Sequence, residues 1–372
     1  MTKPTLRIGL IGTGFMGKAH VFGFTFAPKI FDLAYGLDLH TVADVTPEAA
    51  ARAKVAFGFA HATTRWQDIV ENPEIDLVSI TAPNALHKDM ALAAIRAGKH
   101  VYCEKPLAPL AQDADEMARA AEAAGVKTQV GFNYLCNPML ALAREMIAAG
   151  ELGEIRGYRG LHCEDYMADA GGAFTFRHDP AGGGALADIG SHALATAEFL
   201  CGPVTCLMGD CVTMIDSRPD GKGSRRKVEV DDVARAFLRF ESGATGSIEA
   251  NWIATGRKMQ HDFEIYGTKG ALAFSQEHFN VLNYFSTADA KGRQGFRRIE
   301  AGPDHAPYGL FCVAAGHQLG FNDLKAIEVA GYVQAIAGKA PEPFNFRHGL
   351  RIQTLVEAIH ASSKEQRWID VT

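Results

Sequence analysis

Two short motifs carry side chains that could perform acid–base chemistry. Residues 104–106 are Glu-Lys-Pro, and residues 182–192 contain Asp188 and His192. Lys105 could hydrogen-bond a substrate oxygen and stabilise negative charge that develops there. Asp188 could orient the imidazole of His192, a group that exchanges protons near neutral pH. Taken alone, Lys105 could equally be a surface lysine, and Asp188 with His192 a buried helix-capping pair.

The spacing of Asp188 and His192 favours a shared site. A helix is predicted over residues 185–200, and side chains four residues apart lie on one face of a helix. Glycines at 182–184 would let the start of this helix approach another surface closely. No third metal-ligand side chain lies nearby in the sequence, so we expect no metal ion at this pair.

A glycine-rich turn near the start of the chain predicts a site that binds the phosphates of a dinucleotide. Residues 6–11 form an apolar run typical of a strand buried on both faces, and a G-x-G-x-x-G and a helical pattern follow. Such glycines permit a tight turn, the approach of a pyrophosphate and close helix packing. An ordinary glycine-rich turn is the alternative. The residues predicted to bind the phosphates at this helix start are Gly12, Gly14, Phe15, Met16 and Gly17.

Asp44 bears on the choice of nucleotide. It ends a strand predicted over residues 38–44, where a carboxylate can accept hydrogen bonds from an adenosine ribose. Residues 45–47 contain no arginine that could receive a 2′-phosphate, so NAD is favoured over NADP. The alternative role of Asp44 is to cap the helix predicted over residues 47–57.

Strands alternate with helices up to residue 133, which predicts a doubly wound parallel sheet of the Rossmann type. Ligands bind beyond the carboxyl ends of the strands in such sheets. Further cofactor contacts are therefore expected at that rim from Ala82, Asn84, His87, Glu104, Lys105 and Asn133.

The pattern changes in the second part of the chain. Strands predicted over residues 228–240, 244–253, 259–266 and 271–274 are joined by short turns, so neighbours must be antiparallel. We expect an α+β domain with a large open, mainly antiparallel sheet, and two domains spanning 1–133 and 134–372. One sheet face should be covered by helices, and the other is available for a homo-oligomer, a dimer or tetramer. Residues 217–224 and the basic residues 225–227 are predicted to be loops.

Composition narrows the class of protein. The formal charge is −6 and no long basic run is present, which argues against nucleic acid as a partner. No apolar run approaches the roughly 18 residues of a membrane span, and no signal peptide fits before the first strand. The seven cysteines are scattered and predicted to be reduced, so a cytoplasmic location is expected.

The order of the motifs resembles the glucose–fructose oxidoreductase, inositol dehydrogenase and MocA (Gfo/Idh/MocA) family, nearest to its inositol dehydrogenase branch. The resemblance rests on the glycine turn, Pro-Asn-Ala-Leu-His at 83–87, Glu-Lys-Pro at 104–106, Gly-Phe-Asn at 131–133 and Asp-x-x-x-His at 188–192. It implies that Lys105, Asp188 and His192 are catalytic, and that Arg177 and His317 also contact the substrate. Two departures, the long segment 23–36 and Tyr-Leu-Cys at 134–136, bear on the substrate rather than the fold.

The resemblance implies an NAD-dependent dehydrogenase that acts on a small molecule. It would oxidise a secondary hydroxyl of a cyclic polyol or pyranose to the ketone or lactone. Expected substrates are scyllo- or myo-inositol, or a hexose such as glucose. Two other functions remain open: an NAD-dependent, redox-neutral glycosidase, and a nucleotide-sensing regulator without catalysis.

Overall fold

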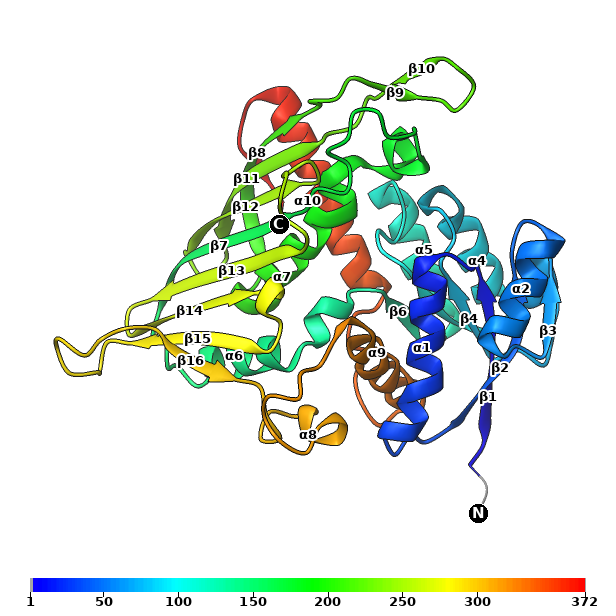
Figure 1. The fold of residues 1–372 in the computed structure, drawn as a ribbon, viewed down its shortest axis with the longest axis horizontal. Coiled ribbons are helices and arrows are strands. Elements are labelled where there is room, and N and C mark those ends of the chain that lie inside the picture. Colours follow the sequence, from blue (N-terminus) through cyan, green and yellow to red (C-terminus); the bar gives the residue numbers. More distant parts are fainter. Residues whose placement is uncertain (1–2, 372) are drawn as a thin grey trace. The chain divides into compact units, whose positions relative to one another are not determined.

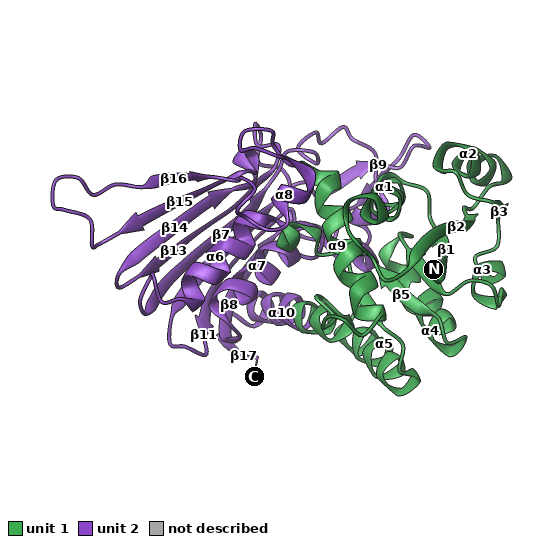
Figure 2. Ribbon diagram, turned by 90° about the horizontal axis from the view of Figure 1, so that it is seen from below, with its two compact units in different colours: residues 1–136, 320–353 green, residues 137–319, 354–372 purple. Residues whose placement is uncertain are grey.

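The computed structural model describes residues 3–371, which form two compact units (Figure 1). Figure 2 shows the first unit, residues up to 136 with 320–353, and the second, residues 137–319 with those from 354 onward. The outermost residues of the two predicted domains, 1–2 and 372, lie outside the described range.

The first unit contains the predicted doubly wound sheet. Its six strands are all parallel, in the order β3-β2-β1-β4-β5-β6. Leu10 in β1 and Ile80 in β4 are fully buried, as expected for strands covered on both faces. The strands are β1 (Thr5–Ile11), β2 (Gly36–Ala43), β3 (His61–Thr63), β4 (Leu77–Ile80), β5 (His100–Cys103) and β6 (Thr128–Val130).

Helices connect these strands, in the alternation that the sequence predicted. The helix α2 ends at Gly58, which has a left-handed φ of 81°. The helices are α1 (Phe15–Ile30), α2 (Pro47–Phe57), α3 (Gln67–Glu71), α4 (His87–Arg96) and α5 (Ala111–Ala124), with short 3₁₀ turns at Asn84–Leu86 and Asn133–Cys136.

A helix from late in the chain completes the first unit. In α9 (Phe321–Ile336), Val329 and Val333 join Leu6 and Ile8 of β1 in one buried apolar cluster. A side chain at Gly23 of α1 would come within 2.8 Å of the Lys325 carbonyl oxygen, so glycine there permits close packing of α1 and α9. The helix pair therefore covers part of the parallel sheet.

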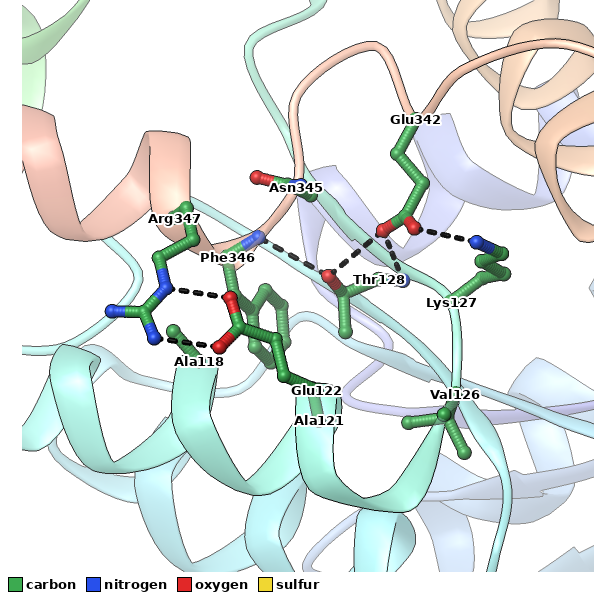
Figure 3. Close-up of a pocket in the computed structure, with 11 residues that line it drawn as sticks. Ala118, Ala121, Glu122, Val126, Lys127, Thr128, Glu342, Asn345, Phe346 and Arg347 are labelled. Carbon is green, nitrogen blue, oxygen red and sulfur yellow. Dashed lines mark hydrogen bonds and ion pairs between the residues drawn. The ribbon is translucent and has the colours of Figure 1, made fainter.

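The start of α10 (Phe346–Glu365) is also fixed to the first unit, as Figure 3 shows. Arg347 donates two hydrogen bonds of 2.6 Å to the carboxylate of Glu122 on α5. Glu342 accepts from the Lys127 ammonium group at 3.0 Å and from the backbone N–H of Thr128 at 3.2 Å. These groups line a hollow of about 250 Å³ at the amino end of β6, the opposite end of that strand from the ligand-binding rim.

The two compact units differ from the single boundary predicted after residue 133. Residues 134–136 and 320–353 join the first unit, because α9 buries its apolar side chains against α1 and β1. A single boundary along the chain cannot assign α9 to the first unit, because α9 follows residues 137–319 of the second unit in the sequence.

The second unit is built on a nine-stranded sheet in the order β16-β15-β14-β13-β7-β12-β11-β8-β17. Neighbouring strands are antiparallel except β7 and β12, which are parallel. The strands are β7 (Ile155–Cys163), β8 (Val204–Val212), β11 (Val233–Phe240), β12 (Thr245–Asn251), β13 (Gln260–Gly267), β14 (Gly270–Ser275), β15 (Val281–Ser286), β16 (Arg297–Glu300) and β17 (Ile369–Asp370).

Helices cover one face of this sheet, as predicted. These are α6 (Pro138–Ala148), α7 (Ser191–Cys201) and the later part of α10 (Figure 1). A side chain at Gly209 of β8 would meet Ile359 at 2.7 Å, so α10 lies directly on that strand. A short helix, α8 (Tyr308–Phe311), precedes the return of the chain to the first unit. None of the helices in residues 3–371 is long and apolar enough to cross a membrane.

Two local predictions for the second unit are wrong. Residues predicted as loops form a small antiparallel pair, β9 (Ser217–Pro219) and β10 (Arg225–Lys227). The strand predicted from residue 228 begins only at Val233, because Asp231 and Asp232 turn inward and bond backbone N–H groups of Leu186 and Met214. Apolar patterning does not register such side-chain anchors. All seven cysteines are free thiols, as predicted.

Candidate active site

The glycine turn between β1 and α1 has the geometry of a phosphate-binding loop. Gly12 has a φ of +96°, and a side chain there would meet the Thr81 carbonyl oxygen at 2.8 Å. A side chain at Gly17 would lie 2.3 Å from the Gly12 carbonyl oxygen. Gly14 faces open space, and as the N-cap of α1 it supplies no side-chain bond to the helix N–H groups. These N–H groups are therefore available to an anion.

Asp44 is bound to this turn and does not cap α2. One of its carboxylate oxygens accepts hydrogen bonds from the backbone N–H of Thr13, at 3.1 Å, and from the Thr13 hydroxyl. The cap of α2 is Thr46, whose hydroxyl accepts from the Ala49 N–H at 3.2 Å. The capping alternative is thus excluded, and Asp44 lies beside the phosphate turn, where a ribose-binding carboxylate is needed.

Other predicted cofactor residues lie in the loops after β4, β5 and β6. Asn133 is 2 % exposed, and its amide nitrogen has no hydrogen-bond partner in the described structure. An unpaired buried amide donor of this kind fits a group that accepts from it when NAD is bound. Ala82 and Asn84 lie in the loop after β4, and Phe15, at the start of α1, is 73 % exposed.

His87 has a different place from the one predicted. Its side chain is fully buried, with ring nitrogens 2.8 Å from the Ala82 carbonyl oxygen and 3.0 Å from that of Pro106. The imidazole of His87 therefore links the loop after β4 to the loop after β5. A contact between His87 and the cofactor would be indirect.

Lys105 follows a carboxylate that is held in a buried network. The Lys105–Pro106 peptide bond is cis, and the Lys105 N–H donates to Glu104 at 3.2 Å. The other oxygen of Glu104 lies 2.8 Å from His20 Nε2 and 2.8 Å from the Lys325 ammonium group. Lys325 also bonds the Tyr102 hydroxyl and Glu328, each at 3.0 Å.

The charges of this network compensate one another. Burial alone would raise the pKa of Glu104, but Lys325 and a hydrogen bond from His20 outweigh it and hold that pKa well below its ordinary value. Burial, aided by the charge of Lys325, lowers the pKa of His20 to about 4. Glu104 is thus ionised and His20 neutral at pH 7. The carboxylate that accepts a hydrogen bond from the Lys105 N–H is therefore fixed in place.

In the second unit, Asp188 forms hydrogen bonds with Tyr166 and Arg177, a grouping that the sequence did not predict. Its Oδ2 atom accepts hydrogen bonds from the Tyr166 hydroxyl and from Arg177 Nε, both at 2.8 Å. The Asp188 side chain is 13 % exposed, and the Arg177 side chain 37 %. A carboxylate, a guanidinium and a phenol within hydrogen-bond distance can bind neighbouring hydroxyl groups of a polyol.

His192 is 5 % exposed and belongs to a cluster of three histidines. Its ring centroid lies 5.6 Å from that of His162 and 6.2 Å from that of His261. The rings of His162 and His261 are a cross-strand pair of β7 and β13, with their Nδ1 atoms 3.2 Å apart.

The hydrogen bonds of this cluster run in one direction when His162 and His261 are neutral. His162 Nε2 lies 3.0 Å from a carboxylate oxygen of Glu164, which only accepts, so this nitrogen carries the proton. His162 Nδ1 then accepts from His261, and His261 Nε2 accepts from the Thr196 hydroxyl at 3.0 Å. Burial, with a contribution from His162, lowers the pKa of His261 well below its usual value, which keeps this ring neutral.

The segment that carries Asp188 and His192 is not the uniform helix predicted. A π-helical turn, Leu186–Gly190, contains Asp188, and α7 then begins at Ser191. Gly184 has a φ of +70°, and a side chain there would lie 2.6 Å from a carboxylate oxygen of Asp231. The glycines do permit the close approach that the sequence predicted. Wide turns of this kind occur frequently at functional sites.

The sequence did not single out several residues of these clusters. His162 lies on β7 and Glu164 follows directly after that strand, and Lys325 and Glu328 are charged residues in a helix whose other buried side chains are mostly apolar. Tyr166 gave no signal, because its partner Asp188 comes from a separate segment. His317 is exposed in the irregular chain between α8 and α9, and its role stays a prediction.

Comparison with protein families gives two matches. The model described as "Oxidoreductase family, NAD-binding Rossmann fold" matches residues 6–132, and the "GFO/IDH/MocA C-terminal domain" model matches residues 140–273.

Individual relatives agree with these matches. The chain is 36 % identical to a levoglucosan dehydrogenase of Pseudarthrobacter phenanthrenivorans, over 98 % of both chains. It is 27 % identical to a myo-inositol 2-dehydrogenase of Thermotoga maritima, over 72 % of this chain and 74 % of that one. A solved levoglucosan dehydrogenase in complex with NADH and levoglucosan has a TM-score of 0.95 and 36 % identity, with 99 % of each chain covered.

Proposed function

Because the chain belongs to the Gfo/Idh/MocA family of NAD-binding oxidoreductases, we propose that it oxidises one secondary hydroxyl of a pyranose sugar. Levoglucosan is the first candidate substrate, since a levoglucosan dehydrogenase is similar over nearly the whole chain. The inositols favoured by the sequence motifs come second, because the inositol dehydrogenase relatives cover about three quarters of it. The observation that carries the proposal is the polar group around Asp188 beside the buried imidazole of His192.

Residues of the first unit would hold NAD. The uncapped N–H groups of α1 would bind the pyrophosphate, Asp44 the adenosine ribose, and the free amide of Asn133 another polar group of the cofactor. NAD supplies the acceptor for the hydride that leaves the carbinol carbon.

The protein's own groups would manage the proton and the charge on oxygen. We assign His192 as the base that takes the hydroxyl proton, and Lys105 as the cation that stabilises the oxygen as that proton leaves. Asp188, which accepts hydrogen bonds from Tyr166 and Arg177, would also accept one from a second hydroxyl of the substrate. It would keep the imidazole of His192 oriented. The neutral ring of His261, with its centroid 6.2 Å from that of His192, would add no charge that repels the protonated form of His192.

The choice of substrate can be tested in one assay. NADH formation, followed by the absorbance of the reduced nicotinamide, is measured with levoglucosan, glucose, other hexoses, and scyllo- and myo-inositol. A kcat/KM for levoglucosan at least tenfold above that for every inositol is expected. If an inositol is the better substrate, the pyranose assignment is wrong. Release of nitrophenol from a nitrophenyl glycoside without net NADH would favour the glycosidase alternative instead.

We also propose that copies of the chain associate through the open face of the nine-stranded sheet. A depression of about 400 Å³ on this face is lined by residues of β7, β8, β11 and β12, and Phe237 is 63 % exposed there. Exposed apolar surface of this kind on a sheet favours association of symmetric copies. A cytoplasmic location likewise stays a proposal of the sequence.

A further inference from the structure

Three metal-ligating side chains from distant parts of the sequence meet in the second unit. Cys211 lies on β8, Asp231 precedes β11, and His360 lies on α10. The Cys211 sulfur, an Asp231 carboxylate oxygen and a His360 ring nitrogen are all within 4.8 Å of one another. None of these three residues belongs to the proposed catalytic group, so the cluster needs a separate explanation.

We propose that Cys211, Asp231 and His360 bind one zinc ion, with water as the fourth ligand. A thiolate, an imidazole and a carboxylate form a mixed donor set that zinc accepts readily. Bonds of about 2.0–2.3 Å to a tetrahedral zinc ion place the ligand atoms roughly 3.3–3.8 Å apart. Since His360 Nε2 and Asp231 Oδ1 are already 3.0 Å apart, small side-chain rotations would complete the geometry.

The surroundings hold two of the ligands and leave an entry path. Asp231 uses its second carboxylate oxygen to accept from the Leu186 N–H at 2.8 Å, which fixes the carboxylate plane. The Cys211 backbone N–H donates to Ser363 at 2.9 Å, so β8 and α10 are bonded beside the cluster. The Asp231 side chain is 3 % exposed but that of His360 is 40 % exposed, and an ion can therefore reach the site from solvent.

The local charge also favours a cation. Asp231 and Asp210 place two carboxylates near the Cys211 sulfur. The same carboxylate charges attract a divalent ion. On binding, the zinc–sulfur bond forms, the thiol proton passes to solvent, and no group is oxidised or reduced.

Zinc here would stabilise the segment that leads to Asp188. The Asp231 carbonyl oxygen accepts a hydrogen bond from the Ala185 N–H at 2.9 Å, and the Asp231 carboxylate accepts one from the N–H of Leu186. An ion that binds Asp231 together with β8 and α10 would thus fix the start of the π-helical turn.

Cobalt(II) replaces zinc in such sites and reports the sulfur ligand directly. Metal-free, full-length protein without a histidine tag is titrated with cobalt(II), and the thiolate-to-cobalt charge-transfer band in the near ultraviolet is recorded. The wild type is expected to give the band at one equivalent and to lose it when zinc is added. Cys211→Ser should abolish the band, and His360→Gln should weaken cobalt binding at least tenfold.

Cys206→Ser is the matched control, because Cys206 lies on the same strand, an odd number of residues away, and therefore points to the other sheet face. It should keep the wild-type band. Zinc should raise the Tm of the wild type and of Cys206→Ser by a few degrees, and leave that of Cys211→Ser unchanged. Absence of the band in the wild type, or its persistence in Cys211→Ser, would overturn the proposal. Equal Tm values of the metal-free proteins would show that the variants fold.

Discussion

Lys105 and His192 are assigned to the same substrate oxygen, and each side chain can be changed while the other is kept. Lys105 rests on the buried Glu104, whereas His192 belongs to a histidine cluster on β7, β13 and α7. Removal of either group should therefore affect the chemical step more than the fold.

We expect Lys105→Met to lower kcat by about 10²-fold or more, because a neutral side chain cannot stabilise an alkoxide-like oxygen. The affinity for NAD, measured by quenching of protein fluorescence, should change little, since the phosphate turn is untouched. His192→Asn should slow the reaction as well. The double variant should lose less than the product of the single losses, because both groups are assigned to one atom. Near wild-type turnover of Lys105→Met would contradict the assignment.

Asp44 should determine the choice between NAD and NADP. Its carboxylate lies beside Thr13, where a 2′-phosphate would meet a like charge. Asp44→Ala should narrow the ratio of kcat/KM for NAD over NADP by tenfold or more. Glu48→Ala, an exposed carboxylate in the first turn of α2, is the control and should leave the ratio unchanged. A wild-type enzyme that prefers NADP would disprove this role.

At the scale of elements, α9 places a fully buried lysine among buried carboxylates. Lys325→Met leaves Glu104 without its positive partner, and loss of one member of a buried pair costs about 3–5 kcal/mol. Urea unfolding should show this loss, and Lys325→Met with Glu104→Gln should recover part of it. Lys339→Met, an exposed lysine just beyond the same helix, should change stability by less than about 0.5 kcal/mol. Strictly additive losses would argue against the network.

His20 on α1 should make stability fall in mild acid. Its pKa is lowered to about 4 by burial, whereas the unfolded imidazole titrates near pH 6.5. Between these two pH values the imidazole of residue 20 is protonated in the unfolded chain but neutral in the folded protein. The free energy of unfolding therefore decreases as the pH falls from 6.5, and the loss is complete near pH 4. The His20 contribution should be about 2 kcal/mol between pH 7 and pH 5. The free energy of unfolding of His20→Gln should depend less steeply on pH, whereas the exposed His61→Gln should follow the wild type.

At the scale of the whole molecule, the open sheet face should decide the oligomeric state. Phe237→Glu places a charge in the depression on that face, and light scattering at micromolar concentration should report a smaller species than for the wild type. Val55→Glu is the control, since Val55 is equally apolar and 83 % exposed but lies on α2 of the first unit. A wild-type monomer, or an unchanged oligomer in Phe237→Glu, would exclude this face as the interface.

Local sequence patterns were enough to predict the elements that depend on neighbours along the chain. The strand–turn–helix at residues 5–30, the parallel alternation up to β6 and the antiparallel strands of the second unit follow from local apolar patterns and turn residues. The chemical groups Lys105, Asp188 and His192 were identifiable for the same reason, because motifs are contiguous.

Which distant groups share a site became known from the packing of whole elements. Lys325 reaches Glu104 across 221 residues, Tyr166 reaches Asp188 across 22, and His360 reaches Asp231 across 129. The sheet register sets His162 against His261, and a π-helical turn rather than an α-helix carries Asp188. Hydrophobic periodicity fixes which face of an element is buried, but contacts between buried polar groups depend on how whole elements pack, and no local pattern encodes that.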